Sequence, residues 1–430
     1  MTTEIPVVTP GAPVEYTCPG EDHSISRSVH LSRLAAFFPA CRNCLHCDDT
    51  GGLAEQTVDR LARTRRRVAR PTLFTSEGVR GIHRNELTRV DADRLVAALA
   101  WLCWQDQPRS LPAGDGPHVG PVVVVGHDAR PAARDLVAGV LAALVRSGCR
   151  ALEIGRVSDP CFRFAVDHLQ ADAGVRVTGA GCGQAWTGLD AVAAQGQPLS
   201  RGGLERWETR TREGHSRPTR QAGQRRSFQA TGVYEANLKR HFSPTRPLSI
   251  CLAVPSGAQA DTLERLFSGL PWTLEQVEGP DQTLAERVTK RTIARGADLG
   301  LVCYDDGARV RACDETGTPV TDQALATLLA TRLLAEHPGR PVILNRGHAG
   351  ESDSMIRRLG GRPRQAAGDS RSETWQAMYD HDAILGLGSE GTIWFRETVP
   401  TCDALLVIGH LLQTIDRQDQ PLSQLIARSH

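Results

Sequence analysis

The sequence predicts an α/β protein with three consecutive domains, each a mixed sheet flanked by helices. The prediction rests on three units in which an apolar, β-branched run is followed by a loop and then by apolar residues at helical spacing. The apolar runs occupy residues 122–125, 248–254 and 342–344. Recurrence of one supersecondary pattern along a chain indicates repeated domains.

The first unit shows the pattern most clearly. Four valines precede a turn at residues 126–131, and the helix that follows is marked by Leu136, Val137, Val140, Leu141, Leu144 and Val145. Leu263 and Leu266 mark the helix of the second unit, and Met355, Ile356 and Leu359 mark that of the third. The predicted order is therefore strand, loop and helix, three times over.

Length and composition fit this organisation. A chain of 430 residues suits three or four compact units, and a hydrophobic content of 40% is enough to form their cores. The net charge of +1 gives no electrostatic argument for nucleic acid or a membrane as a partner. Neither class of partner is expected.

Targeting signals do not stand out in the sequence. Residues 1–20 lack the apolar core of a signal peptide, and no apolar run approaches the roughly 20 residues of a membrane helix. We therefore expect a cytoplasmic protein, in which the 12 cysteines are thiols or metal ligands.

Residues 1–50 form a Cys/His-rich extension that is too short to build a sizeable core. A C-x-x-C turn lets two thiolates face one Zn²⁺. A structural zinc site is expected, and reactive thiols or ordinary reduced cysteines are the alternatives. The expected ligands are Cys18, His23, Cys41 and Cys44, with His30, His46 or Cys47 as alternatives for the fourth position.

Residues 51–71 are expected to form a connecting helix. Arginines crowd its end, where positive charge complements the helix dipole. A solvated connecting helix is favoured over docking on an acidic partner or nucleic acid. No aromatic residues are interleaved with the arginines to favour nucleic acid. The arginines are Arg63, Arg65, Arg66, Arg67 and Arg70.

Residues 177–190 carry a resemblance to a known family. They read V-T-G-A-G-C-G-Q-A-W-T-G-L-D, which resembles V-T-A-S-H-N-P-x-x-Y-N-G-I-K, the phosphoserine loop of the α-D-phosphohexomutases (the phosphoglucomutase/phosphomannomutase family). Residues 73–82, 125–131 and 382–395 are similar to three further motifs of that family, in the same order. The resemblance covers about residues 72 to 415.

The resemblance implies a division of the chain. Domain I is expected at residues 72–200, domain II at 231–317 and domain III at 318–416, with a tail at 417–430. Residues 201–230, rich in Arg, Gly and Thr, are expected to be an exposed linker. The fourth domain of the family, which clamps the distal phosphate, is expected to be missing.

The phosphoserine loop lacks its nucleophile. Ala180 stands in register with the family's serine, and an alanine has no atom that can accept a phosphoryl group. Cys182 lies two positions further on. A reactive thiol needs a lowered pKa, and no basic neighbour in the loop would lower the pKa of Cys182. No catalytic residue is predicted.

The family's metal loop, D-G-D-G/A-D-R, matches residues 304–309. Of the family's charged residues in this loop, only Asp306 and Arg309 are kept. One carboxylate is a poor site for Mg²⁺, which requires several hard oxygen ligands. Magnesium is therefore not expected.

The sugar loop also differs from the family's pattern. Gly388 replaces the glutamate that binds sugar hydroxyls, and Glu390 replaces a serine. Arg80 and Arg130 match arginines that the family places near its phosphoserine. With Arg309 they are expected to hold a sugar phosphate or another anion, and structural ion pairs are the alternative.

Two classes of function remain. The first is a non-catalytic relative of the mutases that acts as a binding, regulatory or scaffold module, with a protein partner. The second is an active phosphohexomutase, or another sugar-phosphate enzyme, with a reorganised site. The replacement of the nucleophile by Ala180 favours the first.

Overall fold

The computed structural model describes residues 15–18, 22–38, 40–41, 44–65, 72–106, 120–183, 185–214, 216–254, 258–279, 283–304, 307–348, 350–418 and 420–428. The chain divides into two compact units, residues 1–73 with 81–88 and residues 74–80 with 89–430, and each is described by itself. Within the described ranges, no helix combines the length and the apolar character needed to cross a membrane.

The smaller unit contains little regular structure. An antiparallel pair, β1 (Glu15–Thr17) and β2 (Ser24–Ser26), is followed by helices α1 (Arg27–Ala35) and α2 (Glu55–Arg65). The Ser26 side chain caps α1 by accepting a hydrogen bond from the backbone N–H of Val29. The connecting helix predicted for this segment is present as α2, and the side chains of the arginine cluster at 63–70 lie outside the described part of the chain.

The first sheet of the larger unit has six strands in the order β3-β7-β6-β4-β5-β8. β4 lies parallel to both β5 and β6, whereas β7 runs antiparallel to β6, so the sheet is mixed as predicted. The strands are β3 (Val79–Ile82), β4 (Val122–His127), β5 (Arg150–Arg156), β6 (Ala173–Val177), β7 (Trp186–Ala193) and β8 (Gln224–Ser227).

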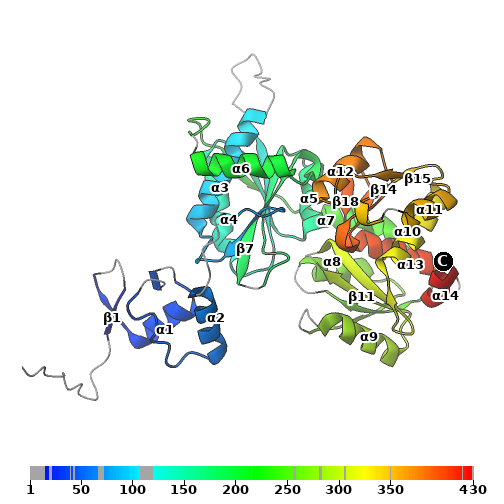
Figure 1. Cartoon of the computed structure of the whole chain (residues 1–430), viewed down its shortest axis with the longest axis horizontal. Coiled ribbons are helices and arrows are strands. Elements are labelled where there is room, and N and C mark those ends of the chain that lie inside the picture. The colour runs from blue at the N-terminus through cyan, green and yellow to red at the C-terminus, as the bar shows by residue number, and fades with distance from the viewer. Residues whose placement is uncertain are drawn as a thin grey trace, which may run out of the picture. The chain divides into compact units, whose positions relative to one another are not determined.

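Helices cover both faces of this sheet. The chain steps from β4 outward to β5 and then back across β4 to β6, so right-handed crossovers place α4 and α5 on opposite faces. Figure 1 shows α4 and α5 on either side of the strands. The helices of this region are α3 (Arg89–Asp106), α4 (Ala133–Arg146), α5 (Asp159–His168) and α6 (Arg201–Glu213).

The expected linker at residues 201–230 is instead structured, and most of it belongs to this first region. α6 begins at Arg201, after its N-cap Ser200, and its Leu204 and Trp207 are buried. The Trp207 indole donates to the Leu95 carbonyl of α3 at 2.8 Å. β8 then pairs parallel with β5. The linker prediction was wrong because two apolar residues on one helical face are enough to anchor an otherwise polar, arginine-rich helix.

The second and third sheets repeat one topology. Each has three parallel strands followed by two antiparallel strands, in the orders β10-β9-β11-β12-β13 and β15-β14-β16-β17-β18. The second contains β9 (Ser249–Ala253), β10 (Thr273–Gln276), β11 (Leu299–Tyr304), β12 (Arg309–Asp314) and β13 (Pro319–Val320). The third contains β14 (Pro341–Leu344), β15 (Arg362–Gln365), β16 (Leu385–Leu387), β17 (Ile393–Arg396) and β18 (Pro400–Cys402).

The helices that accompany these sheets begin and end at recognisable caps. Thr321 caps α10, and Ser370 with Glu373 forms a capping box at the start of α12. Gly296 ends α9 in the left-handed conformation. The helices are α7 (Ala230–Leu238), α8 (Ala258–Phe267), α9 (Leu284–Arg295), α10 (Asp322–Glu336), α11 (Glu351–Arg358), α12 (Arg371–Asp380), α13 (Ala404–Arg417) and α14 (Leu422–Arg428), with 3₁₀ turns η2 (Ala194–Gly196), η3 (Lys239–His241), η6 (Arg346–His348) and η7 (Ser389–Gly391).

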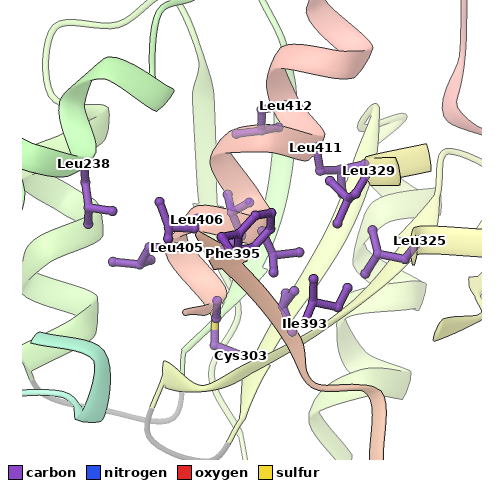
Figure 2. Close-up of a cluster of buried hydrophobic side chains, with 14 of the residues drawn as sticks. Leu238, Cys303, Leu325, Leu329, Ile393, Phe395, Leu405, Leu406, Leu411 and Leu412 are labelled. Carbon is purple, nitrogen blue, oxygen red and sulfur yellow. The ribbon is translucent and has the colours of Figure 1, made fainter. Parts of the chain in front are cut away.

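α13 joins the second and third sheets through one hydrophobic core. Every residue from Ala404 to Asp416 is buried. Figure 2 shows leucines of α13 among Leu238 of α7, Cys303 of β11, and Leu325 and Leu329 of α10. The residues predicted as a C-terminal tail add to this core, because Leu422 and Leu425 of α14 are buried in the same cluster.

Candidate functional site

The loop after β6 carries Ala180 and is held in place by one buried carboxylate. Asp128 follows β4, and its Oδ2 accepts hydrogen bonds from the Thr178 hydroxyl and the Gly179 backbone N–H, both at 3.0 Å. The Thr178 hydroxyl oxygen in turn accepts from the backbone N–H of Ala180 at 3.0 Å. The backbone of this loop is therefore tied to the end of the neighbouring strand, although Ala180 offers only a methyl group.

Arg130 fastens the far side of the same loop. Its Nη1 donates to the carbonyl oxygens of Gly183 and Trp186 at 2.7 and 3.1 Å, and its Nη2 donates to the Cys182 carbonyl at 2.9 Å. Its Nε lies 3.2 Å from Asp128 Oδ2. Arg130 was expected to hold an anion, but in the structure its guanidinium group donates hydrogen bonds to backbone carbonyls of this loop.

Arg80 is buried and forms an ion pair with Asp190, which lies within β7. Burial disfavours its charge, but the Asp190 carboxylate outweighs this effect, so the pKa of Arg80 is raised. Arg80 Nε also lies 3.4 Å from the Ala180 carbonyl oxygen. Asp190 occupies the position where the family's loop has lysine, so a negative charge stands where the resemblance implies a positive one.

A second buried carboxylate, Asp159, was not identified from the sequence. Its Oδ2 lies 2.9 Å from Arg163 Nε and 3.1 Å from Arg371 Nη2. Burial opposes ionisation, yet the two arginines hold the pKa of this carboxyl far below its usual range. Arg371 starts α12, so the pair joins the first and third sheets of the larger unit. Residues so far apart in sequence leave no local pattern by which they could be found.

Two of the three positions that match the family's metal ligands are described in the structure, and neither carries a carboxylate. Asp305 and Asp306 lie outside the described residues. Ala308, in register with the family's third aspartate, is buried in an apolar cluster with Ile343, Trp375 and Trp394. Tyr304, in register with the first aspartate, has its ring 5.6 Å from the guanidinium carbon of Arg309. Apolar and aromatic side chains therefore occupy two of the three ligand positions.

The sugar loop has no space for the family's glutamate. A Cβ atom at Gly388 would lie 2.2 Å from the Thr392 hydroxyl oxygen and 2.9 Å from Trp394 Nε1. Glu390 adopts a left-handed conformation with φ of 55°. Its backbone carbonyl accepts a hydrogen bond from Arg309 Nη1 at 2.7 Å. Arg309 thus connects the loop that matches the family's metal site with the sugar loop.

The predicted zinc ligands lie in the smaller unit. Cys18, Cys41 and Cys44 are buried, whereas His23 is exposed. Burial raises the pKa of the Cys41 thiol, and the neighbouring thiols of Cys18, Cys44 and Cys47 raise it further. Arg33 donates to Cys18 Sγ at 3.0 Å. In the part of the chain that the structure describes, however, no three ligand atoms of these cysteines and histidines lie within 4.8 Å of one another.

The alternative histidines of this unit have other roles. His30 stacks on Tyr16 at 4.2 Å between ring centroids, and its Nε2 lies 3.1 Å from the Asp49 carbonyl oxygen. His46 meets the same Tyr16 ring edge-on at 5.2 Å. Among the described residues, the group with three ligand atoms within 4.8 Å of one another is His241, Glu397 and His410, in the larger unit.

The fold and this set of loops define a class: α/β proteins with consecutive mixed sheets whose inter-strand loops carry phosphosugar-mutase motifs. The family profile described as phosphoglucomutase/phosphomannomutase, alpha/beta/alpha domain I, matches residues 71–216. The profile covers about a third of the chain, and this part is similar to domain I of the α-D-phosphohexomutases.

Curated relatives carry mutase names. A phosphomannomutase/phosphoglucomutase of Pseudomonas aeruginosa is 24% identical over 340 residues, which cover 76% of this chain and 70% of the relative. A phosphoglucosamine mutase of Lacticaseibacillus casei is 24% identical over 381 residues, covering 82% of this chain and 80% of the relative.

Solved structures share the fold. A phosphoglucomutase/phosphomannomutase family protein from Burkholderia thailandensis superimposes with a TM-score of 0.73 at 20% identity, over 83% of this chain and 79% of that one. A putative phosphomannomutase from Thermus thermophilus gives a TM-score of 0.69 at 20% identity, over 84% of each chain. At this identity the likeness concerns the fold alone.

Proposed function

We propose that this chain is a phosphohexomutase relative that has lost mutase chemistry and acts as a binding, regulatory or scaffold module. The observation that carries the proposal is Ala180, a methyl group on a loop whose backbone Asp128 and Arg130 still hold in place. Without a nucleophile the covalent phospho-enzyme of the family's mechanism cannot form.

The loop that matches the family's metal site supports the proposal independently. Phosphoryl transfer depends on positioning and on stabilising charge, which a bound cation supplies in this family. Ala308 lies in an apolar cluster and Tyr304 presents an aromatic ring, so this loop offers few of the oxygen ligands that Mg²⁺ prefers. Two requirements of the reaction are therefore affected at separate places.

A sugar phosphate or another anion is the proposed residual ligand, with Arg80, Arg130 and Arg309 as its contacts. An incoming anion must compete with Asp190 for Arg80, with Asp128 and backbone carbonyls for Arg130, and with the Glu390 carbonyl for Arg309. We therefore expect weak binding, with a Kd of roughly 1 mM or higher. A protein partner in the cytoplasm is proposed for the scaffold role.

The mutase names of the relatives support one alternative, an active phosphohexomutase with a reorganised site. The deciding experiment is an assay of the purified chain with glucose 1-phosphate and mannose 1-phosphate, primed with the bisphosphate sugar. No turnover above a no-enzyme control is expected, and no phospho-adduct in residues 177–190. Turnover or a stable adduct would establish the alternative.

Ala180→Ser extends this experiment. Activity should stay at background in this variant because the metal loop and the sugar loop are altered as well. Recovery of turnover by the single substitution would show that only the nucleophile had been lost. A relative with an intact serine, assayed in parallel, establishes that the conditions detect turnover.

A structural zinc ion in the smaller unit is the second part of the proposal. The expected ligands are Cys18, His23, Cys41 and Cys44, and the exposure of His23 makes Cys47 the preferred alternative for the fourth position. The apolar clusters of this unit are small, so a metal would contribute its folding free energy directly.

Removal of the metal tests the zinc proposal. A chelator should unfold the smaller unit, seen as rapid proteolysis within residues 15–65, while the larger unit keeps its melting transition. Cys47→Ser should lose zinc and His23→Ala should keep it. Absence of stoichiometric zinc from protein purified without chelator would contradict the proposal, and the reverse result for the two variants would restore His23 as the ligand.

A further inference from the structure

Two buried histidines and a glutamate meet in the larger unit, away from the loops described above. His241 ends the 3₁₀ turn η3, His410 lies within α13, and Glu397 directly follows β17. One ligand atom from each residue lies within 4.8 Å of the other two, and His241 Nε2 is 3.6 Å from Glu397 Oε1. Three elements far apart in sequence therefore bring one carboxylate and two imidazoles together.

The group lies beside a cavity of about 590 Å³. His241 and His410 have exposed fractions of 9% and 6%, so most of their surfaces are withdrawn from bulk water. The cavity is also lined by polar side chains, among them Tyr234, Asn237, Thr398 and Thr401. A ligand or water held by the group would have space on this side.

Charged groups surround the two imidazoles. Arg240 Nε donates to His241 Nε2 at 3.1 Å, and Arg332 Nη1 lies 2.9 Å from His410 Nδ1, which accepts. Arg240 also pairs with Glu397, and Arg332 Nε lies 3.6 Å from Glu336. Each imidazole thus presents a nitrogen lone pair to a cationic donor, which requires the neutral form of the ring.

Burial and the arginine charges favour this neutral form. Burial, followed by the charges of Arg240 and Arg332, lowers the pKa of His241 to about 4. Burial and the same neighbours hold the pKa of His410 well below its usual value. Neutral imidazole is the form that binds metal ions.

We propose that His241, Glu397 and His410 form a binding site for a divalent transition-metal ion such as Zn²⁺, with the remaining coordination position facing the cavity. Two imidazoles and one carboxylate are a donor set used by zinc and other first-row ions in sites that keep a position open. Zinc bonds of about 2.0–2.2 Å require the three ligand atoms to close by roughly 1 Å, which side-chain rotation supplies.

Arg240 is the group that the metal must displace. It binds both His241 and Glu397, and its positive charge opposes that of the ion. Its side chain is 58% exposed, so it can leave for solvent at little cost, as is typical of a surface ion pair. Arg332 is more deeply buried and also donates to the His410 carbonyl, so His410 must exchange one hydrogen bond for a metal bond.

This site differs from the metal site of the family. The family's loop supplies oxygen ligands at residues 304–309, whereas the new group supplies two nitrogens from η3 and α13. The inference does not depend on the proposed loss of mutase chemistry, because none of its residues belongs to the Ala180, metal or sugar loops. A polar junction held by arginines, without metal, is the competing interpretation.

Cobalt titration of the metal-free full chain tests the proposal. Co²⁺ bound by nitrogen and oxygen gives visible d–d bands without the thiolate charge-transfer absorption of a cysteine site, so this group is distinguished from the cysteines of the smaller unit. Saturable d–d absorption displaced by Zn²⁺, and not by Mg²⁺, is expected. Mg²⁺ serves as the negative control because it prefers oxygen ligands.

Variants give effects of opposite sign. Glu397→Gln and His410→Gln should weaken Co²⁺ binding at least about tenfold, since each removes one of three ligands. Arg240→Gln should tighten it at least about tenfold, because a competing positive charge is lost. Arg206→Gln, which removes an arginine of similar exposure paired with Asp106, should change nothing.

The signs separate the two interpretations. A merely structural junction would be destabilised by Arg240→Gln and would gain no affinity for metal. Thermal melting of each variant in chelator monitors folding, so a variant that fails to fold is recognised, and Arg240→Gln remains informative when a ligand variant is lost. No thiolate-independent cobalt absorption in the wild-type chain, or unchanged affinity in Arg240→Gln, would overturn the proposal.

Discussion

The Ala180 loop and the Tyr304–Arg309 loop have departed from the family's pattern in different ways. In the first, the polar frame of Asp128, Thr178 and Arg130 is intact and one reacting group is missing. In the second, a buried alanine and an aromatic ring occupy the places of two metal ligands. The Ala180 loop should therefore still accept the serine hydroxyl that it lacks. At Ala308, by contrast, the family's aspartate would no longer fit its apolar surroundings.

Ala308→Asp should have the largest effect on stability. The new carboxyl would enter an apolar cluster beside Trp375 and Trp394, so we expect a loss of about 5 kcal/mol in the free energy of unfolding and no gain in Mg²⁺ binding. Denaturant unfolding with and without Mg²⁺ measures both. Ala142→Asp on the exposed face of α4 is the control, with a cost of about 1 kcal/mol or less. Stabilisation of Ala308→Asp by Mg²⁺ would show that the loop can still form a metal site.

Asp190→Ala tests the frame behind the Ala180 loop. It leaves the buried guanidinium of Arg80 without its carboxylate, so unfolding free energy should fall by about 3–5 kcal/mol. Asp93→Ala breaks the more exposed pair with Arg146 and should cost about 1 kcal/mol or less. Equal losses of unfolding free energy in the two variants would mean that Asp190 is not structural. Binding of inorganic phosphate to Asp190→Ala would then test whether Arg80 can hold an anion.

Gly388→Ala examines the sugar loop. Its methyl group would lie against the Thr392 hydroxyl, so we expect a loss of about 1–3 kcal/mol. Gly202→Ala, inside α6 and with open space at its Cβ, should be neutral or stabilising by up to about 1 kcal/mol. If both variants unfold at the same denaturant concentration as the wild type, the sugar loop is not tightly packed.

Ala180→Ser should have the smallest effect, within about 0.5 kcal/mol of the wild type in unfolding free energy, because Ala180 is partly exposed and its backbone contacts stay the same. Thr178→Ala in the same loop removes a hydroxyl that contacts both Asp128 and the Ala180 N–H, and should cost about 1–3 kcal/mol. A large loss of unfolding free energy in Ala180→Ser would show that the Ala180 loop, like the Tyr304–Arg309 loop, no longer accepts the family's residue. The difference between the two loops would then disappear.

Much of the fold could be predicted from the sequence because its signals are local. The valines of β4 and the apolar spacing of α4 mark these elements without reference to the rest of the chain. The order of the family motifs then identified the surrounding domains. α6 and β8 were missed because their polar sequences are anchored by few residues, and the contact of Trp207 with Leu95 exists only in the folded chain.

The candidate site was predicted less well, for a physical reason. Replacement of the serine by Ala180 is visible in the sequence, but the partner of Arg80 is Asp190, 110 positions away. Charge reversal at Asp190 was the available signal, and only the fold shows that this charge meets Arg80. The group of His241, Glu397 and His410 gave no signal, because its members follow no common motif.

The burial of α13 on all sides has a mechanical consequence. A helix whose residues from Ala404 to Asp416 are all withdrawn from solvent cannot act as a hinge, so the second and third sheets must move as one body. Backbone amides of α13 should therefore exchange with solvent only when both sheets open together, at the rate of the slowest opening in the larger unit.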